Sequence, residues 1–96
     1  MTYFKISEYK LRGFRKSNTK HKKYDAIIEN KKTKKINNVP FGDSRHKMYQ
    51  DKTGLNLYPH LIHSDKKRRD SYRSRHKHFL REGFFSPGYF AYYYLW

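Results

Sequence analysis

The segment Ser64–Glu82, with the sequence SDKKRRDSYRSRHKHFLRE, combines helix signals, apolar periodicity and dense positive charge. Ser64 is a favourable helix N-cap, and Asp65 places an anion in the first turn, where the helix dipole favours it. Gly83 follows as a natural helix stop. The segment therefore predicts one amphipathic basic helix. Charge then disappears, because residues 83–96 hold eight aromatic side chains and no charged one.

One face of this helix is expected to pack inside the protein. A packing stripe needs residues at spacings of three and four, and the residues that satisfy it are Arg69, Tyr72, His76, Phe79 and Leu80. The other basic side chains point away from that stripe. They are candidates for binding a polyanion or a protein partner, and they are Lys66, Lys67, Arg68, Arg73, Arg75, Lys77 and Arg81.

The aromatic tail that follows is too apolar to remain in water. Each aromatic side chain buries roughly 150–250 Å², so an exposed tail would form a larger apolar patch than soluble monomers tolerate. Ser86, Pro87 and Gly88 are expected to turn the chain back onto the helix. We expect one side of the tail in the core and the other against a partner, and the candidates are Tyr89, Phe90, Tyr92, Tyr93, Tyr94 and Trp96.

Composition limits the chain of 96 residues to one small domain with an aromatic core. Only 35% of the residues are hydrophobic, and they include 10 Tyr, 7 Phe and 1 Trp. The 23 Lys and Arg outnumber the 8 Asp and Glu, which leaves a net charge of +15. Such a charge repels itself in the compact state and attracts polyanions. Cysteine is absent, so disulfides and thiolate metal sites are excluded.

Upstream of the helix, residues 24–41 are typical of a β-hairpin. Tyr24, Ala26 and Ile28 alternate onto one face, and Val39 and Phe41 share a face after the turn. The turn is rich in lysine. Those side chains either touch a phosphate backbone or keep the hairpin tip soluble, and they are Lys31, Lys32, Lys34 and Lys35.

Between hairpin and helix, residues 42–44 predict a turn and an N-cap, which start a short helix over residues 45–51. A mixed apolar loop broken by Pro59 follows over residues 55–63. Residues 1–23 are expected to be a basic N-terminal arm outside the domain, with Arg12 and Arg15 as candidate binding residues. We thus predict a small α+β domain over residues 24–96.

Few residues offer catalytic or metal-binding chemistry. Four histidines form the pairs His60-x-x-His63 and His76-x-His78, but a spacing of two along a helix sends side chains to different sides. We expect no metal site and no cofactor. Asp43, His46 and Asp51 form a conceivable nuclease cluster whose spacing matches no diagnostic motif. A non-catalytic binding protein is the preferred interpretation, and a nuclease is a weaker one.

Two segments carry a resemblance to a known family. They are VPFGDSRHKMYQDKTGLNLYPHLIHSDKKRRDSYRSRHKHF (39–79) and SPGYFAYYYLW (86–96). Over residues 24–96 the chain resembles small basic proteins encoded by large nucleocytoplasmic DNA viruses of algae and amoebae. The resemblance implies a viral origin and a location in the virion or inside the infected host cell. No catalytic residue transfers with it, because the family has no established function.

Two functions remain open from the residues. The first is a minor capsid or capsid-lining protein of a giant virus that binds other virion proteins with acidic surfaces, since arginine pairs well with carboxylates. The second is a sequence-nonspecific DNA-binding protein that organises or condenses the viral genome, since the same charges neutralise phosphates. No apolar run reaches the roughly 18 residues of a membrane span, and we expect the protein to act within a larger assembly.

Overall fold

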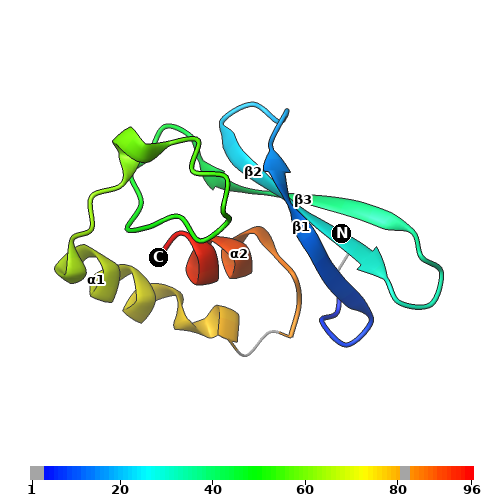
Figure 1. Ribbon diagram of the computed structural model, residues 1–96. Helices are drawn as coiled ribbons and strands as arrows, with labels where there is room; N and C mark the ends of the chain where they lie inside the picture. Colours follow the sequence, from blue (N-terminus) through cyan, green and yellow to red (C-terminus); the bar gives the residue numbers. More distant parts are fainter. Residues whose placement is uncertain (1–3, 81–82) are drawn as a thin grey trace.

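The computed structural model describes residues 4–80 and 83–96, and these form an α+β domain, as predicted. Three strands come first, and two α-helices follow a long irregular connection (Figure 1). The elements are β1 (Tyr9–Lys16), β2 (Lys22–Asn30), β3 (Ile36–Asp43), the 3-10 turn η1 (Pro59–Leu61), α1 (Lys66–His76), the 3-10 turn η2 (Lys77–Leu80) and α2 (Pro87–Tyr94). In Figure 1, α2 lies between the sheet and α1.

The predicted hairpin is confirmed as β2 and β3. The two strands pair antiparallel, with Tyr24 opposite Phe41 and Ala26 opposite Val39. Alternation sends Tyr24, Ala26, Val39 and Phe41 to the same buried face. Ile28 extends this face along β2 and is also fully buried.

Of the predicted N-terminal arm, residues 4–23 do not form a separate arm, because they contain β1. This strand pairs antiparallel with β2, which makes β2 the central strand of the sheet. The register shifts between Leu11 and Gly13, where Arg12 has no cross-strand partner, so β1 contains a β-bulge. Beyond the shift Phe14 lies opposite Ala26 and packs against Phe41, with ring centroids 5.7 Å apart.

The short helix predicted over residues 45–51 is wrong. The Asp43 side chain accepts a hydrogen bond from the Arg45 backbone N–H at 2.8 Å, which makes a turn that does not continue as a helix. Met48 is buried instead and pairs with the segment after η1. Its N–H donates to the Leu61 oxygen, and its own oxygen accepts from the His63 N–H, both at 2.9 Å. Burial and long-range pairing of Met48 outweigh the local helix signal.

The main basic helix is confirmed, with different ends. Its N-cap is Asp65 rather than Ser64, and the Asp65 carboxylate accepts from the Lys67 and Arg68 N–H groups. Ser64 has a φ of 55°, so it belongs to the preceding turn. The α-helix ends at His76 and tightens into η2.

The aromatic tail forms α2, where the sequence predicted only a turn and a folded-back segment. Ser86 caps the helix by accepting from the Tyr89 N–H at 3.1 Å, and Pro87 occupies the first turn. Both signals are typical of a helix start. The tail does enter the core as predicted, since Phe85, Phe90 and Leu95 pack with the buried face of the sheet. The core is therefore largely aromatic.

Candidate polyanion-binding groove

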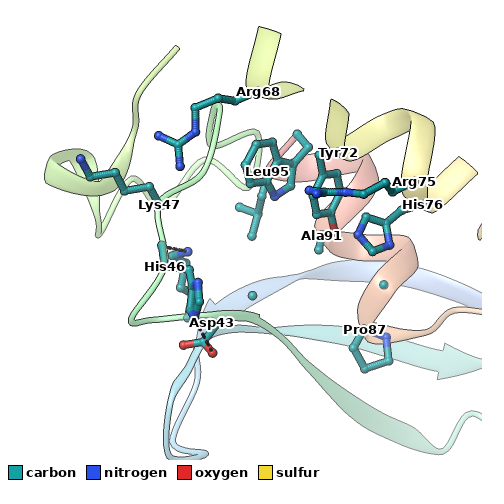
Figure 2. Close-up of a pocket in the computed structure, with 14 residues that line it drawn as sticks. Asp43, His46, Lys47, Arg68, Tyr72, Arg75, His76, Pro87, Ala91 and Leu95 are labelled. Carbon is teal, nitrogen blue, oxygen red and sulfur yellow. Dashed lines mark hydrogen bonds and ion pairs between the residues drawn. The ribbon is translucent and has the colours of Figure 1, made fainter. Parts of the chain in front are cut away.

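A half-open groove of about 520 Å³ lies where α1, α2 and the end of β3 meet (Figure 2). Basic side chains line it from both sides. Figure 2 shows Lys47 and Arg68 on one side and Arg75 and His76 on the other. The complete lining is Lys23, Gly42, Asp43, His46, Lys47, Arg68, Tyr72, Arg75, His76, Pro87, Gly88, Ala91, Leu95 and Trp96.

The helical spacing of α1 selects its contribution to the groove. Arg68, Tyr72, Arg75 and His76 recur every three or four residues, so they share one side of the helix. Arg68 and Arg75 are exposed, whereas Tyr72 is partly buried between them. The helix therefore presents to the groove the exposed guanidinium groups of Arg68 and Arg75 and the partly buried ring of Tyr72.

Arg73, a predicted binding residue, makes contacts within the protein. Its guanidinium lies over the Tyr92 ring, 5.0 Å from the centroid, and its Nε donates to the Trp96 backbone oxygen at 3.3 Å. Arg69, predicted to pack inside, lies over the Tyr49 ring at the same distance. Cation–π contacts thus attach α1 to Tyr49 in the loop after β3 and to Tyr92 in α2.

The aromatic tail is predicted to pack on the stripe of α1, and Trp96 in the tail contacts this stripe at Tyr72. The Trp96 and Tyr72 rings stack with 4.3 Å between centroids and 7° between planes. His63 packs against Trp96 at 5.2 Å, and His76 against Tyr72 at 4.4 Å. These four rings form an aromatic column, and three of them, Tyr72, His76 and Trp96, line the groove. The side chains of Phe79 and Leu80, also assigned to the stripe, lie outside the described residues.

Most of the aromatic candidates for partner binding serve the fold. Phe90 and Tyr92 are buried, and Tyr89, Tyr94 and Trp96 are partly buried. Tyr93 is the exposed member, with 38% of its surface accessible. Among the six candidates, Tyr93 is therefore the aromatic side chain with most surface available to a partner.

Lys23 and Lys47 are the cationic groove residues that the sequence did not single out, and Lys23 is the buried one. It alternates with the core residue Tyr24 along β2, so the pattern predicts exposure, but the loop after β3 covers it and leaves 1% accessible. Its Nζ donates to the His46 backbone oxygen at 2.8 Å. Burial lowers the pKa of Lys23 to about 8, against the opposing pull of Asp43 and Asp51. No local sequence signal marks this site.

Asp43, His46 and Asp51 do not assemble into one cluster. Asp43 is held by Arg45, whose Nη2 donates at 2.8 Å, and these hydrogen bonds lower the Asp43 pKa. His46 Nε2 lies 3.6 Å from the same carboxylate. Asp51 instead accepts from the Tyr24 hydroxyl at 2.5 Å and from Thr53. Each carboxylate thus has internal hydrogen-bond donors.

The two histidine pairs lie in different surroundings, and the His76 and His78 rings, expected on different sides of the helix, have centroids 6.2 Å apart. His63 is partly buried beside Trp96, its Nδ1 accepts from the Asp65 N–H at 2.9 Å, and burial together with Arg68 lowers its pKa. His60 is exposed. The pKa of His76 is lowered by burial and by Arg75 and His78. Within the described ranges, no three His, Asp or Glu side chains are placed to hold a metal ion.

The other candidate basic residues lie outside the groove. Arg15 is paired with Asp25 at 3.1 Å, and its side chain remains 49% exposed. Eight further candidates are exposed on α1, on η2, on β1 and at the turn between β2 and β3. They are Lys66, Lys67, Lys77, Arg12, Lys31, Lys32, Lys34 and Lys35. Lys67 lines a smaller hollow of about 350 Å³ beside Trp96. Arg81 lies outside the described residues.

Comparison with known proteins adds no relative, since no protein-family model, curated protein or solved structure matches the chain. In the part of the chain that is described, neither helix is long and apolar enough to cross a bilayer. The site is therefore interpreted from its own chemistry.

Proposed function

We propose that this protein is a non-catalytic structural component of a large DNA virus particle, a minor capsid or capsid-lining protein that attaches to a polyanionic neighbour. One observation carries the proposal. Cationic side chains from β2, from the loop after β3 and from α1 converge on one groove. The one carboxylate in its lining, Asp43, is already bound by Arg45. A groove with this charge balance requires a negatively charged partner.

The overall charge and the resemblance support the same proposal. A net charge of +15 on 96 residues is self-repelling until a polyanion neutralises it. The viral setting comes from the resemblance of residues 24–96 to small basic proteins of giant viruses. Arginine and aromatic side chains, which gather around the groove, are also the residues most enriched at interface centres.

The non-catalytic part of the proposal is supported by the state of the carboxylates. Asp43 is occupied by Arg45, and Asp51 by Tyr24 and Thr53. A nuclease needs carboxylates that are available to a metal or a water molecule. A metal-dependent nuclease activity lost in Asp43→Asn would contradict this part.

Cross-linking of purified virus particles tests the proposal directly. Lysine-reactive cross-linking followed by mass spectrometry is expected to join Lys47, Lys66 or Lys67 to a neighbouring virion component. Those lysines border the groove or lie on the same helix. Absence of the protein from purified particles would overturn the particle assignment, while its binding chemistry could still be measured on the isolated protein.

A second candidate is a sequence-nonspecific protein that organises the viral genome. The observation that favours it is the spread of positive charge along the longest dimension of the molecule, 41 Å. Figure 1 places α1 and the lysine-rich turn between β2 and β3 at opposite ends. Duplex DNA carries one charge per about 1.7 Å, so 41 Å spans roughly 24 phosphates.

This second candidate is tested by the salt dependence of duplex binding. The logarithm of the affinity should fall linearly with the logarithm of the salt concentration, with a slope of about −0.9 per phosphate contacted. A slope near zero, or no binding at low salt, would exclude a genome-organising role.

A further inference from the structure

The groove lining contains a buried charge, Lys23, which Asp43 and Asp51 attract without forming an ion pair with it. Lys23 has 1% of its surface accessible, and its Nζ donates one hydrogen bond, to the His46 backbone oxygen. An ammonium group has three N–H donors. Within residues 4–80 and 83–96 no carboxylate forms an ion pair with it. Buried charges are costly unless they are paired and fully hydrogen-bonded, so this site favours an anion from outside.

The cations around Lys23 indicate a ligand with several negative charges. Lys47, Arg68 and Arg75 line the same groove, and Figure 2 shows Lys47 and Arg68 on one side of it and Arg75 on the other. Together with Lys23 they are four cations against Asp43, which Arg45 already binds. A single carboxylate would leave most of this charge uncompensated. A strand with closely repeated charges would compensate it.

The aromatic column determines which part of such a strand the groove can recognise. The Trp96 ring is covered by Tyr72 on one side and packed by His63, and Tyr72 is packed in turn by His76. Stacking of an unpaired base needs an open ring face, and the Trp96 and Tyr72 rings are partly buried and already stacked on each other. The groove therefore presents charged donors rather than a stacking platform.

We propose that this groove binds the sugar–phosphate backbone of a nucleic acid strand, with the exposed Lys47, Arg68 and Arg75 contacting non-bridging phosphate oxygens and the buried Lys23 adding its positive charge to the site. The inference rests on the proposed function, because it names the polyanion held by the same site. Arginine forks bind phosphate oxygens in pairs, and lysine contacts them as a point charge. Successive phosphates are joined at fixed spacing along one covalent strand, so they bring the repeated charge that four neighbouring cations require.

Trp96 supplies a built-in reporter, because it is the single tryptophan of the chain and lines the groove. The protein is titrated at low salt with a single-stranded 12-nucleotide DNA, and Trp96 emission is followed. A saturable change is expected, because Arg68, Arg75 and Lys23 all lie in the same lining as Trp96. An oligoglutamate peptide of equal charge is titrated in parallel and is expected to bind at least tenfold more weakly.

Matched variants locate the binding. Removing a charge-assisted hydrogen bond typically weakens binding about tenfold, so Arg68→Ala with Arg75→Ala should weaken DNA binding by about 100-fold. The control, Lys32→Ala with Lys35→Ala, removes the same charge from the exposed turn between β2 and β3. It should weaken binding only a few-fold. Lys23→Met and Lys47→Glu should each weaken binding about tenfold or more, and they provide the test if the arginine variant does not fold.

Each outcome decides between the proposals. Equal losses in the two double variants would overturn the groove as the site. Equal affinity for the oligoglutamate peptide would overturn the phosphate assignment and leave the proposed attachment to a polyanionic neighbour intact. Absence of binding to either probe at low salt would overturn both.

Discussion

The Tyr24 hydroxyl joins three parts of the chain at one buried point. It donates to Asp51 at 2.5 Å and accepts from the Leu57 N–H at 3.0 Å, while the ring packs between Phe41 and Tyr58. Burial, followed by the bond to Asp51, raises the pKa of Tyr24 to about 12. At the scale of single residues, the loop after β3 is thus fixed to the sheet by polar groups as well as by apolar contacts.

Tyr24→Phe is expected to lower the free energy of unfolding by about 1–3 kcal/mol, because it leaves the Leu57 N–H and an Asp51 oxygen without their partner. Chemical denaturation monitored by circular dichroism measures the change. Tyr93→Phe is the control, since Tyr93 is exposed, and it should change the value by less than about 0.5 kcal/mol. Equal effects of the two substitutions would contradict the role of the Tyr24 hydroxyl.

Lys23 should make stability increase with pH in the alkaline range. Its pKa is about 8 in the folded protein and 10.5 when exposed, so the unfolded chain binds more protons between these values. Stability therefore rises as pH rises from about 8 toward 10.5. Between pH 7.5 and 9.5 the gain attributable to Lys23 should be on the order of 2 kcal/mol.

The measurement compares denaturation of the protein and of Lys23→Met at pH 7.5 and 9.5. Other lysines contribute to both proteins, so the difference between the two pH dependences isolates Lys23. The upper limit avoids ionisation of Tyr24, which acts in the opposite direction above about pH 10 because its folded pKa is raised. Parallel pH dependences would show that Lys23 titrates normally.

At the scale of elements, α2 is the piece that holds the domain together. It lies between β3 and α1, and Leu95 directly after it approaches the backbone of the sheet at Gly42. Gly42 has a φ of 73°, and a Cβ added there would lie 2.7 Å from Leu95 Cδ1. Gly42 thus permits both the backbone conformation and the close approach of α2.

Gly42→Ala should destabilise the protein more than Gly54→Ala does. Both glycines have positive φ, which costs roughly 1–3 kcal/mol for another residue. Only Gly42 would also clash, because nothing lies within 4 Å of a Cβ at Gly54. The difference in denaturation midpoint, with Gly13→Ala as an unstrained reference, measures the contribution of the α2 contact. Equal losses at Gly42 and Gly54 would show that this contact tolerates an added methyl group.

The sequence predicted those elements whose signals agree with their long-range contacts. Alternation around Tyr24 and Phe41 identified the hairpin, and the cap and periodicity identified α1. It missed β1, because the bulge after Leu11 breaks the alternation. It missed α2, although Ser86 and Pro87 are helix-start signals, because a continuous aromatic run has no polar face.

The candidate site was predictable only in part, for a related reason. Arg68 and Arg75 were identified by their charge and by their place on the helix, and both line the groove. Arg73 and Arg15 carry the same charge but form internal contacts, which depend on neighbours distant in the sequence. Lys23 was missed because strand alternation predicts that its side chain is exposed. Its burial comes from the loop after β3, which the alternation pattern does not predict.

At the scale of the whole molecule, repulsion between uncompensated positive charges opposes the stabilisation that comes from burying the aromatic core. Three carboxylates, Asp25, Glu29 and Asp43, form ion pairs with lysine or arginine among the described residues. The remaining surface is strongly positive, since the net charge is +15. The compact state therefore contains repulsion that ions or a bound polyanion can relieve.

Thermal stability should consequently rise with ionic strength. Raising sodium chloride from about 0.02 M to 0.3 M shortens the Debye length from roughly 20 Å to below 10 Å, so the melting temperature should increase by several degrees. A short DNA at low salt should produce a comparable rise, because a ligand that binds the folded state stabilises it. Differential scanning fluorimetry measures both effects. A melting temperature that falls with added salt would mean that attractive ion pairs outweigh the repulsion.

The position of Phe85, Phe90 and Leu95 in the core also bears on synthesis of the chain. These residues cover the inner face of a sheet whose strands leave the ribosome much earlier, and the Phe85 N–H closes back onto the Phe4 oxygen at 2.8 Å. A nascent chain that ends before Ser86 has made its strands but cannot bury them. The sheet can therefore bury its inner face only after Phe85, Phe90 and Leu95 have left the ribosome, and until then it depends on chaperones or on early capture by its binding partner.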